Sequence, residues 1–127
     1  MSDTIDSRLQ ALGITLPEAA APAANYVPYV ISGNLLYLSG QLPIEGGKIA
    51  VTGLVGADVV LADAQRAAEL CAINILAKAS AALAGDLSRI TRVIKLNGFV
   101  ASRAAVGMAS LPLNAAVEID AILEIKL

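Results

Sequence analysis

The C-terminal segment alternates between apolar and polar residues in the way that is typical of a half-buried strand. Across residues 117–125 every second position is apolar, and Glu118, Asp120 and Glu124 lie between these positions. Alternate side chains of a strand point to opposite faces of the sheet. The pattern therefore predicts a strand with one face on the core and one acidic face, preceded by a turn at 111–114.

The same pattern analysis predicts the other elements of the chain. A short helix ends at Gly13 and a long alanine-rich helix ends at Gly85, because glycine accepts the left-handed conformation that follows many helices. Gly, Asn and Pro mark the turns between strands. The expected elements are a helix over 4–12, two strands within 29–43 that turn at 32–34, a turn at 46–47 followed by a strand, a helix over 61–84, a strand over 90–100, and a strand on either side of the turn at 111–114.

The connection after the strand at 90–100 is too short for the expected arrangement. Only Ala101 and Ser102 separate this strand from the next, which begins near Arg103, and no Gly, Pro or Asn is present to form a tight turn. Neighbouring parallel strands need a crossover of about a dozen residues or more, usually a helix. We therefore expect that a segment is absent between Ser102 and Arg103.

Composition indicates one domain with an unusually apolar surface. The chain has 127 residues, of which 57% are hydrophobic, and its mean hydropathy is +0.70. No uninterrupted apolar run reaches the roughly 18 residues that a membrane span needs. The excess apolar surface predicts contacts between subunits. The N-terminal residues include acids and no cationic region followed by an apolar one, so we expect a cytoplasmic protein without a signal peptide.

The residues that the sequence lacks exclude several kinds of chemistry. With no histidine and a single cysteine, Cys71, the chain has neither a thiolate–histidine pair nor the usual zinc ligands. Cys71 lies among apolar residues of the long predicted helix, so we expect a buried, unreactive thiol. A net charge of −2, a pI near 4.9 and few aromatic residues disfavour binding to nucleic acid.

Arg103 and Glu118 are the candidate functional residues. Each places a charge on a short apolar strand, where it contributes nothing to a core. Solvation explains the acidic face of the last strand as well as a ligand does. Arg103 favours a ligand, because its planar guanidinium matches a carboxylate and keeps its charge at any working pH. Asp120, on the same predicted face as Glu118, stays open as a further cleft residue.

Three motifs, in the same order along the chain, resemble the YjgF/RidA family, also called the endoribonuclease L-PSP family, and in particular its chorismate-mutase-like subgroup. They are GNLLYLSGQLP, the alanine-rich helix that ends in AGDLSRITRVIKLNGFVAS, and RAAVGMASLPLNAAVEIDAI. The resemblance begins near Ala24, which leaves residues 1–24 as an N-terminal extension of a single domain, 1–127. It implies an α+β fold in which a mixed β-sheet is backed by helices, and a homotrimer with clefts between the subunits.

Members of this family carry a loop and a second helix between the strand at 90–100 and the arginine strand, and the present sequence has no such residues. Two explanations stay open: a true deletion, and a longer protein from whose sequence this segment has been left out. We favour the second, because a deletion would uncover sheet surface and break the crossover. In that case the Cα atoms of Ser102 and Arg103 lie much farther apart than the about 3.8 Å of a peptide bond.

The resemblance also assigns site residues. The family's catalytic arginine matches Arg103 and its acidic partner matches Glu118, with the family's spacing between them. A cysteine that the family often has two positions after the arginine is Ala105 here, and a pocket asparagine would fall in the absent segment. The matched substrate-binding positions are Tyr26, Ser39, Gly40 and Gln41.

The resemblance implies the hydrolysis of reactive 2-imino acids to 2-keto acids and ammonia, with no metal and no organic cofactor. Arg103 would bind the carboxylate of a small metabolite, and Glu118 would act as general base toward water. The main alternative is a non-enzymatic protein that binds small carboxylates or regulates a partner. Chorismate-mutase-like and endoribonuclease activities rank lower, the latter because the chain is acidic and has no histidine.

Overall fold

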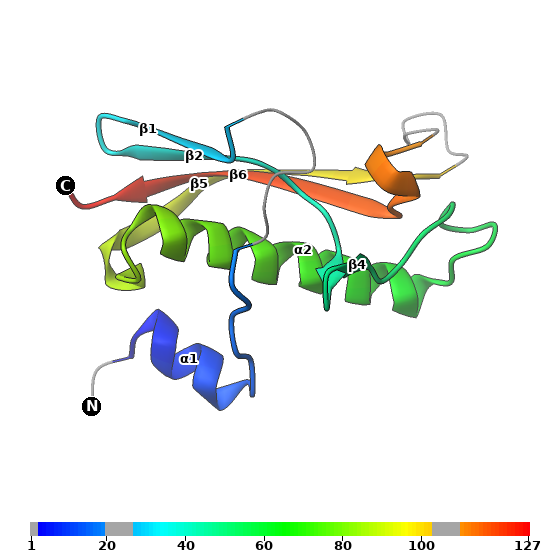
Figure 1. Ribbon diagram of the computed structural model, residues 1–127, viewed down its shortest axis with the longest axis horizontal. Helices are drawn as coiled ribbons and strands as arrows, with labels where there is room; N and C mark the ends of the chain where they lie inside the picture. Colours follow the sequence, from blue (N-terminus) through cyan, green and yellow to red (C-terminus); the bar gives the residue numbers. More distant parts are fainter. Residues whose placement is uncertain (1–2, 20–26, 103–109) are drawn as a thin grey trace.

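One helix lies along one face of a sheet, and no described helix or strand covers the other face, which we call the open face (Figure 1). The computed structural model describes residues 3–19, 27–102 and 110–127. Helix α2 (Leu61–Ala82) covers a four-stranded sheet with the strand order β1-β2-β6-β5. The strands are β1 (Tyr29–Ser32), β2 (Leu35–Gln41), β5 (Ile90–Val100) and β6 (Val117–Ile125). All pairs within this sheet are antiparallel.

The smaller elements surround α2. A two-stranded hairpin, β3 (Ile44–Glu45) and β4 (Lys48–Ile49), leads from the sheet toward the helix. Helix α1 (Ile5–Ala11) lies on the far side of α2 from the sheet and contacts the 3-10 helix η1 (Leu87–Arg89) (Figure 1). A second 3-10 helix, η2 (Pro112–Asn114), forms the expected turn before β6.

The hydrophobic core lies between α2 and the two central strands. Leu36 on β2 lies opposite Leu123 on β6, and both side chains are buried against the helix. Alanine is the best helix former and leaves room for close packing, which explains why an alanine-rich segment forms this helix. The buried residues of the main cluster are Leu36, Leu38, Ile75, Ala79, Leu83, Leu87, Ala121, Leu123 and Ile125.

These observations confirm the predicted α+β fold, whereas the strand expected from Arg103 lies outside the described residues. The apolar positions of β6 face the core, while Glu118 and Asp120 lie on the opposite face, half-buried. The backbone of Gly85 has a φ of 85°, in the left-handed region that ends the long helix as expected. The hairpin between β1 and β2 turns at Gly33, whose φ of 60° is equally unfavourable for other residues.

The side of β5 that faces α2 is uncovered. Val93, Leu96 and Val100 lie opposite the core residues of β6, yet their side chains are 55%, 59% and 41% exposed. This strand stands at the edge of the described sheet, and α2 packs on β2 and β6. Bare apolar surface at this place agrees with the expected absence of a segment after Ser102. Arg103 itself lies outside the described residues, so the expected Cα separation stays a prediction.

Replacing Leu36 by Ala should lower the free energy of unfolding by about 2–5 kcal/mol, because a large side chain is removed from a fully buried position. Urea denaturation at a fixed protein concentration measures the change. Leu61→Ala is the matched control: Leu61 is 70% exposed, and this variant should stay within about 0.5 kcal/mol of the wild type. Equal losses in the two variants would contradict the assigned core.

Candidate functional site

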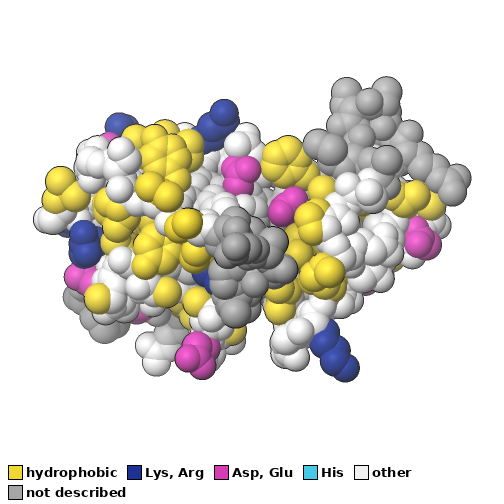
Figure 2. Space-filling model, turned by 45° about the horizontal axis from the view of Figure 1, so that its top comes forward, with side chains coloured by type: hydrophobic (Ala, Val, Ile, Leu, Met, Phe, Trp, Pro, Cys, Tyr) yellow, Lys and Arg dark blue, Asp and Glu magenta, His cyan; other side chains and the backbone are white. Residues whose placement is uncertain are grey.

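The open face of the sheet carries the acidic residues of β6. Glu118 lies opposite Phe99 of β5, and Asp120 lies opposite Asn97. Figure 2 views the molecule obliquely onto this side and shows acidic side chains among hydrophobic ones in the middle of the face. Side chains alternate between the two faces along β6, so both carboxylates lie on the open face while the alternate side chains, such as Val117 and Ala121, are buried in the core.

Glu118 packs directly against the backbone of Gly40. A β-carbon added to this glycine would lie 2.8 Å from Cδ of Glu118, closer than real β-carbons approach, and 3.1 Å from Cγ, which is tighter than most real contacts. Gly40 belongs to an irregular part of β2, where the register with β6 shifts between Leu38 and Gln41. The glycine therefore makes room for the Glu118 side chain, a role that the sequence did not reveal.

The surroundings of Glu118 favour its protonated form. Burial raises the pKa of the Glu118 carboxyl above its ordinary value, and the negative charge of Asp120 raises it further. Within the described ranges, Glu118 forms no ion pair that would counter these effects. A carboxylate with a raised pKa is a stronger base once it is ionised, which suits proton abstraction from water.

Ser39 and Gln41 are engaged in bonds that shape β2. The Ser39 hydroxyl donates a hydrogen bond of 3.0 Å to the carbonyl oxygen of Pro28, which holds the chain before β1 against β2. The Gln41 amide donates one of 3.0 Å to the carbonyl oxygen of Ser39, and the Gln41 side chain is buried. Both residues therefore help to place Gly40, which lies between them.

The structure brings together only part of the predicted site. Glu118 and Gly40 are in contact, and Ser39 and Gln41 flank the glycine. Arg103 and Tyr26 lie outside the described residues, so their assignments stay predictions. One pair was missed: Asn97 donates a hydrogen bond of 2.8 Å to Oδ1 of Asp120. No sequence signal identifies it, because the pairing depends on the β5–β6 register.

The single thiol lies beneath this site. Cys71 of α2 is buried, as predicted, and its Sγ donates a hydrogen bond of 3.6 Å to the carbonyl oxygen of Val117. Burial, together with the charge of Glu118, raises the pKa of the Cys71 thiol to about 12. The thiol is therefore uncharged at neutral pH.

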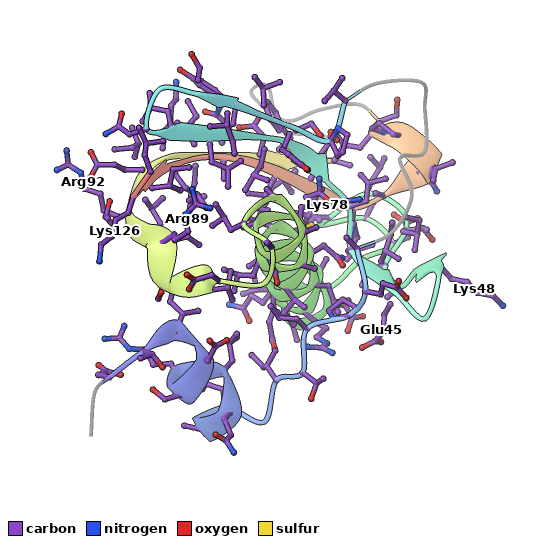
Figure 3. All side chains as sticks on the ribbon, turned by 60° about the vertical axis from the view of Figure 1, so that its left-hand side comes forward. Glu45, Lys48, Lys78, Arg89, Arg92 and Lys126 are labelled. Atoms are coloured by element: carbon purple, nitrogen blue, oxygen red, sulfur yellow. The ribbon has the colours of Figure 1, made fainter. Side chains whose placement is uncertain are left out.

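A group of cations lies at the other end of the sheet. Figure 3 shows Arg89, Arg92 and Lys126 gathered where β5 begins and the chain ends. Arg92 forms an ion pair of 3.3 Å with Glu124 across the strands, and Arg89 donates a hydrogen bond of 2.9 Å to the carbonyl oxygen of Lys126. Arg92 is therefore paired with an acid of the neighbouring strand in the same chain. Among the described residues, no three potential ligands gather as a metal site would require.

A family model matches residues 6–126 of the chain and is described as "YjgF/chorismate mutase-like, putative endoribonuclease". The chain belongs to this family. The match begins within helix α1, inside the segment 1–24 that was expected to be an extension.

Similar proteins support the same YjgF-family assignment. The protein TCP17 of Trypanosoma cruzi is 42% identical over 98% of this chain and 96% of its own length. The crystal structure of Atu1372, a protein of unknown function from Agrobacterium tumefaciens, is 61% identical and superimposes with a TM-score of 0.86 over 96% of this chain and 92% of that one. RidA from an Antarctic Psychrobacter bacterium is 27% identical, with a TM-score of 0.58 over 85% of this chain and 94% of its own.

The TCP17 alignment is longer than this chain, which agrees with the expected absence of a segment. It spans 155 positions, whereas this YjgF-family chain has 127 residues, so at least 28 positions have no residue of this chain opposite them. An extra loop and helix would have about this length. The place of these positions between Ser102 and Arg103 stays a prediction. In the described part of the chain, no helix is long and apolar enough to cross a membrane, and the cytoplasmic location also stays a prediction.

Gly40→Ala should move the Glu118 side chain without unfolding this YjgF-family domain. The new β-carbon meets the flexible end of Glu118, and the glycine has no positive φ, so we expect a loss of less than about 1 kcal/mol in unfolding free energy. The Glu118 carboxyl resonance should titrate at a different pH, as followed by ¹³C NMR. Gly98→Ala is the control, because nothing lies within 4 Å of its added β-carbon. An unchanged Glu118 titration in Gly40→Ala would refute the contact.

Proposed function

We propose that the protein hydrolyses small 2-imino acids, or their enamine forms, to 2-keto acids and ammonia. The observation that carries this proposal is the half-buried Glu118, which packs on Gly40, with its pKa raised by burial and by Asp120. The chain belongs to the YjgF family and is similar to a RidA structure. The imine chemistry is what the resemblance of the sequence motifs to the YjgF/RidA family implies.

Glu118 acts as the general base in this proposal. Its carboxylate accepts a proton from water while the water oxygen bonds to the imine carbon, an effect that is typically worth about 10²- to 10⁴-fold. The C=N π electrons move to the nitrogen, which takes up the proton from Glu118 to give a carbinolamine. Glu118 then accepts the hydroxyl proton and passes it to the nitrogen, so that the C–N bond breaks, ammonia leaves and the keto group forms. Arg103, as the resemblance implies, binds the substrate carboxylate through two parallel N–H donors. No step requires a metal or an organic cofactor.

The protein works as a homotrimer in this proposal, with its open sheet faces turned inward and the clefts between subunits. An apolar row crosses the open face: Val30 lies opposite Tyr37, and Tyr37 lies opposite Ile122. Val30 and Tyr37 are 53% and 40% exposed, although each belongs to a well-paired strand. A continuous apolar row of this kind is typical of a surface that packs against another subunit.

The substitutions Arg103→Ala and Glu118→Gln should abolish most of the activity. With iminobutanoate generated in situ, we expect Glu118→Gln to lower kcat by about 10²- to 10⁴-fold, because the amide keeps the shape but cannot accept the proton. Arg103→Ala should lower kcat/KM by roughly 10²-fold or more, because it removes the carboxylate clamp. Ammonia release is measured against buffer alone.

A pH profile and a control complete this test. Because the Glu118 pKa is raised, the wild-type rate should increase with pH through a midpoint above that of an ordinary glutamate. Arg66→Ala should keep full activity, since Arg66 pairs with Glu45 and Glu69 away from the open face. Wild-type protein that binds 2-ketobutyrate but releases no ammonia above buffer would favour the non-enzymatic carboxylate-binding alternative.

Tyr37→Lys should convert the trimer into monomers, because a charge in the middle of the apolar row would be buried without a partner. Sedimentation equilibrium should then give about one third of the wild-type mass. The control is Leu61→Lys, which changes an exposed residue at the start of α2 and should leave the mass unchanged. A wild-type protein that sediments as a monomer would overturn the trimer.

A further inference from the structure

Asn97 and Asp120 form a polar pair that the proposed reaction does not yet use. The amide nitrogen of Asn97 on β5 donates a hydrogen bond of 2.8 Å to Oδ1 of Asp120 on β6, and both side chains are half-buried. The two residues lie opposite each other in the antiparallel register. Directly opposed side chains that bond in this way hold one another in a single orientation.

We propose that Asp120, held by Asn97, is a positioning residue that makes the Glu118 carboxylate beside it a stronger general base. This inference rests on the proposed function of Glu118. Asp120 touches neither substrate nor water in the proposed reaction, and it acts through the carboxylate beside it. In this proposal Asn97 orients Asp120, and Asp120 acts on Glu118. The sequence analysis assigned neither role.

The geometry explains how Asp120 acts. Two residues along a strand are about 7 Å apart and point to the same face, so the carboxylates of Asp120 and Glu118 are neighbours on the open face. At this separation and half-burial, two like charges repel each other appreciably. The charge of Asp120 therefore makes Glu118 hold its proton more firmly and, once ionised, makes it a stronger base.

Asn97 fits this role better than a cation would. Its amide is a neutral donor, so it fixes the Asp120 carboxylate without adding a positive charge beside it. A lysine or arginine at position 97 would form an ion pair with Asp120 and weaken its effect on Glu118. The other end of the same strand shows the contrast, because Arg92 there is paired with Glu124.

Among the described residues, Asp120 is the charged group that raises the pKa of Glu118. From β2 the neighbours are Gly40 and the uncharged residues beside it, and Tyr37 lies farther along, opposite Ile122. From β5 the opposing residue is Phe99, and Lys95 also lies opposite Ile122. From α2 the thiol of Cys71 approaches, which is uncharged near neutral pH. Glu124 stands six residues away along β6, paired with Arg92.

The test follows the Glu118 carboxyl by ¹³C NMR in the full-length wild type and in Asp120→Asn, with the resonance assigned from Glu118→Gln. The asparagine keeps the shape of Asp120 and removes its charge, so the Glu118 titration midpoint should move to lower pH. Asn97→Ala frees Asp120 and should move the midpoint in the same direction by a smaller amount. Glu124→Gln removes an acid from the same face of β6 and should leave the midpoint unchanged.

Kinetics then test the catalytic side of the inference. In Asp120→Asn the acidic limb of the kcat profile should move to lower pH, and the high-pH plateau should fall by roughly two- to tenfold, because a weaker base accepts the proton. A purely structural role would lower stability without moving this limb.

The outcomes separate the two proposals. An unmoved Glu118 midpoint in Asp120→Asn overturns the inference whatever the kinetics show, and a moved midpoint with an unchanged profile overturns its catalytic part. A wild type that hydrolyses no imine overturns the proposed function, and with it the catalytic part. In that case the NMR midpoints still decide whether Asp120 controls the protonation of Glu118.

Discussion

The packing of α2 against β2 and β6 is the constraint on which the rest of the structure depends. This packing buries one face of β6 in the core, where the side chains of Ala121, Leu123 and Ile125 lie. Because side chains alternate along a strand, the same contact forces Glu118 and Asp120 onto the open face together. A slip of one residue would bury both acids, which is far too costly to occur. The core therefore determines where the chemistry can lie.

The site is built at some cost to stability. A carboxyl whose pKa is raised on folding binds its proton more tightly in the folded state than in the unfolded state. For Glu118 this means that the free energy of unfolding falls as pH rises from the unfolded pKa through the raised, folded one. A cation in contact with Glu118 would relieve this loss of stability by lowering the pKa of the Glu118 carboxyl, but it would also make the Glu118 carboxylate a weaker base. Such conflicts between stability and function are common in active sites.

Sequence reasoning succeeded where a short local pattern decides the structure. The alternation at 117–125 identified both faces of β6, and Gly13 and Gly85 located the ends of the helices. It failed where two distant segments must be aligned. The shifted register between β2 and β6 brings Gly40 under Glu118, and the β5–β6 ladder brings Asn97 to Asp120. Bulges of this kind leave no periodic signal, so only the fold reveals these contacts.

The uncovered apolar side of β5 lies next to the place where the sequence predicts an absent segment. Val93, Leu96 and Val100 follow the core side of the sheet, but no described element covers them. They occur at the edge strand, and this strand leads directly into Ser102, where the sequence predicted a missing crossover. A helix placed there would lie beside α2 and bury these side chains, and its crossover would let the arginine strand run parallel to β5. The uncovered apolar side of β5, the short connection after Ser102 and the longer TCP17 alignment all agree with the expected crossover segment, which stays a prediction.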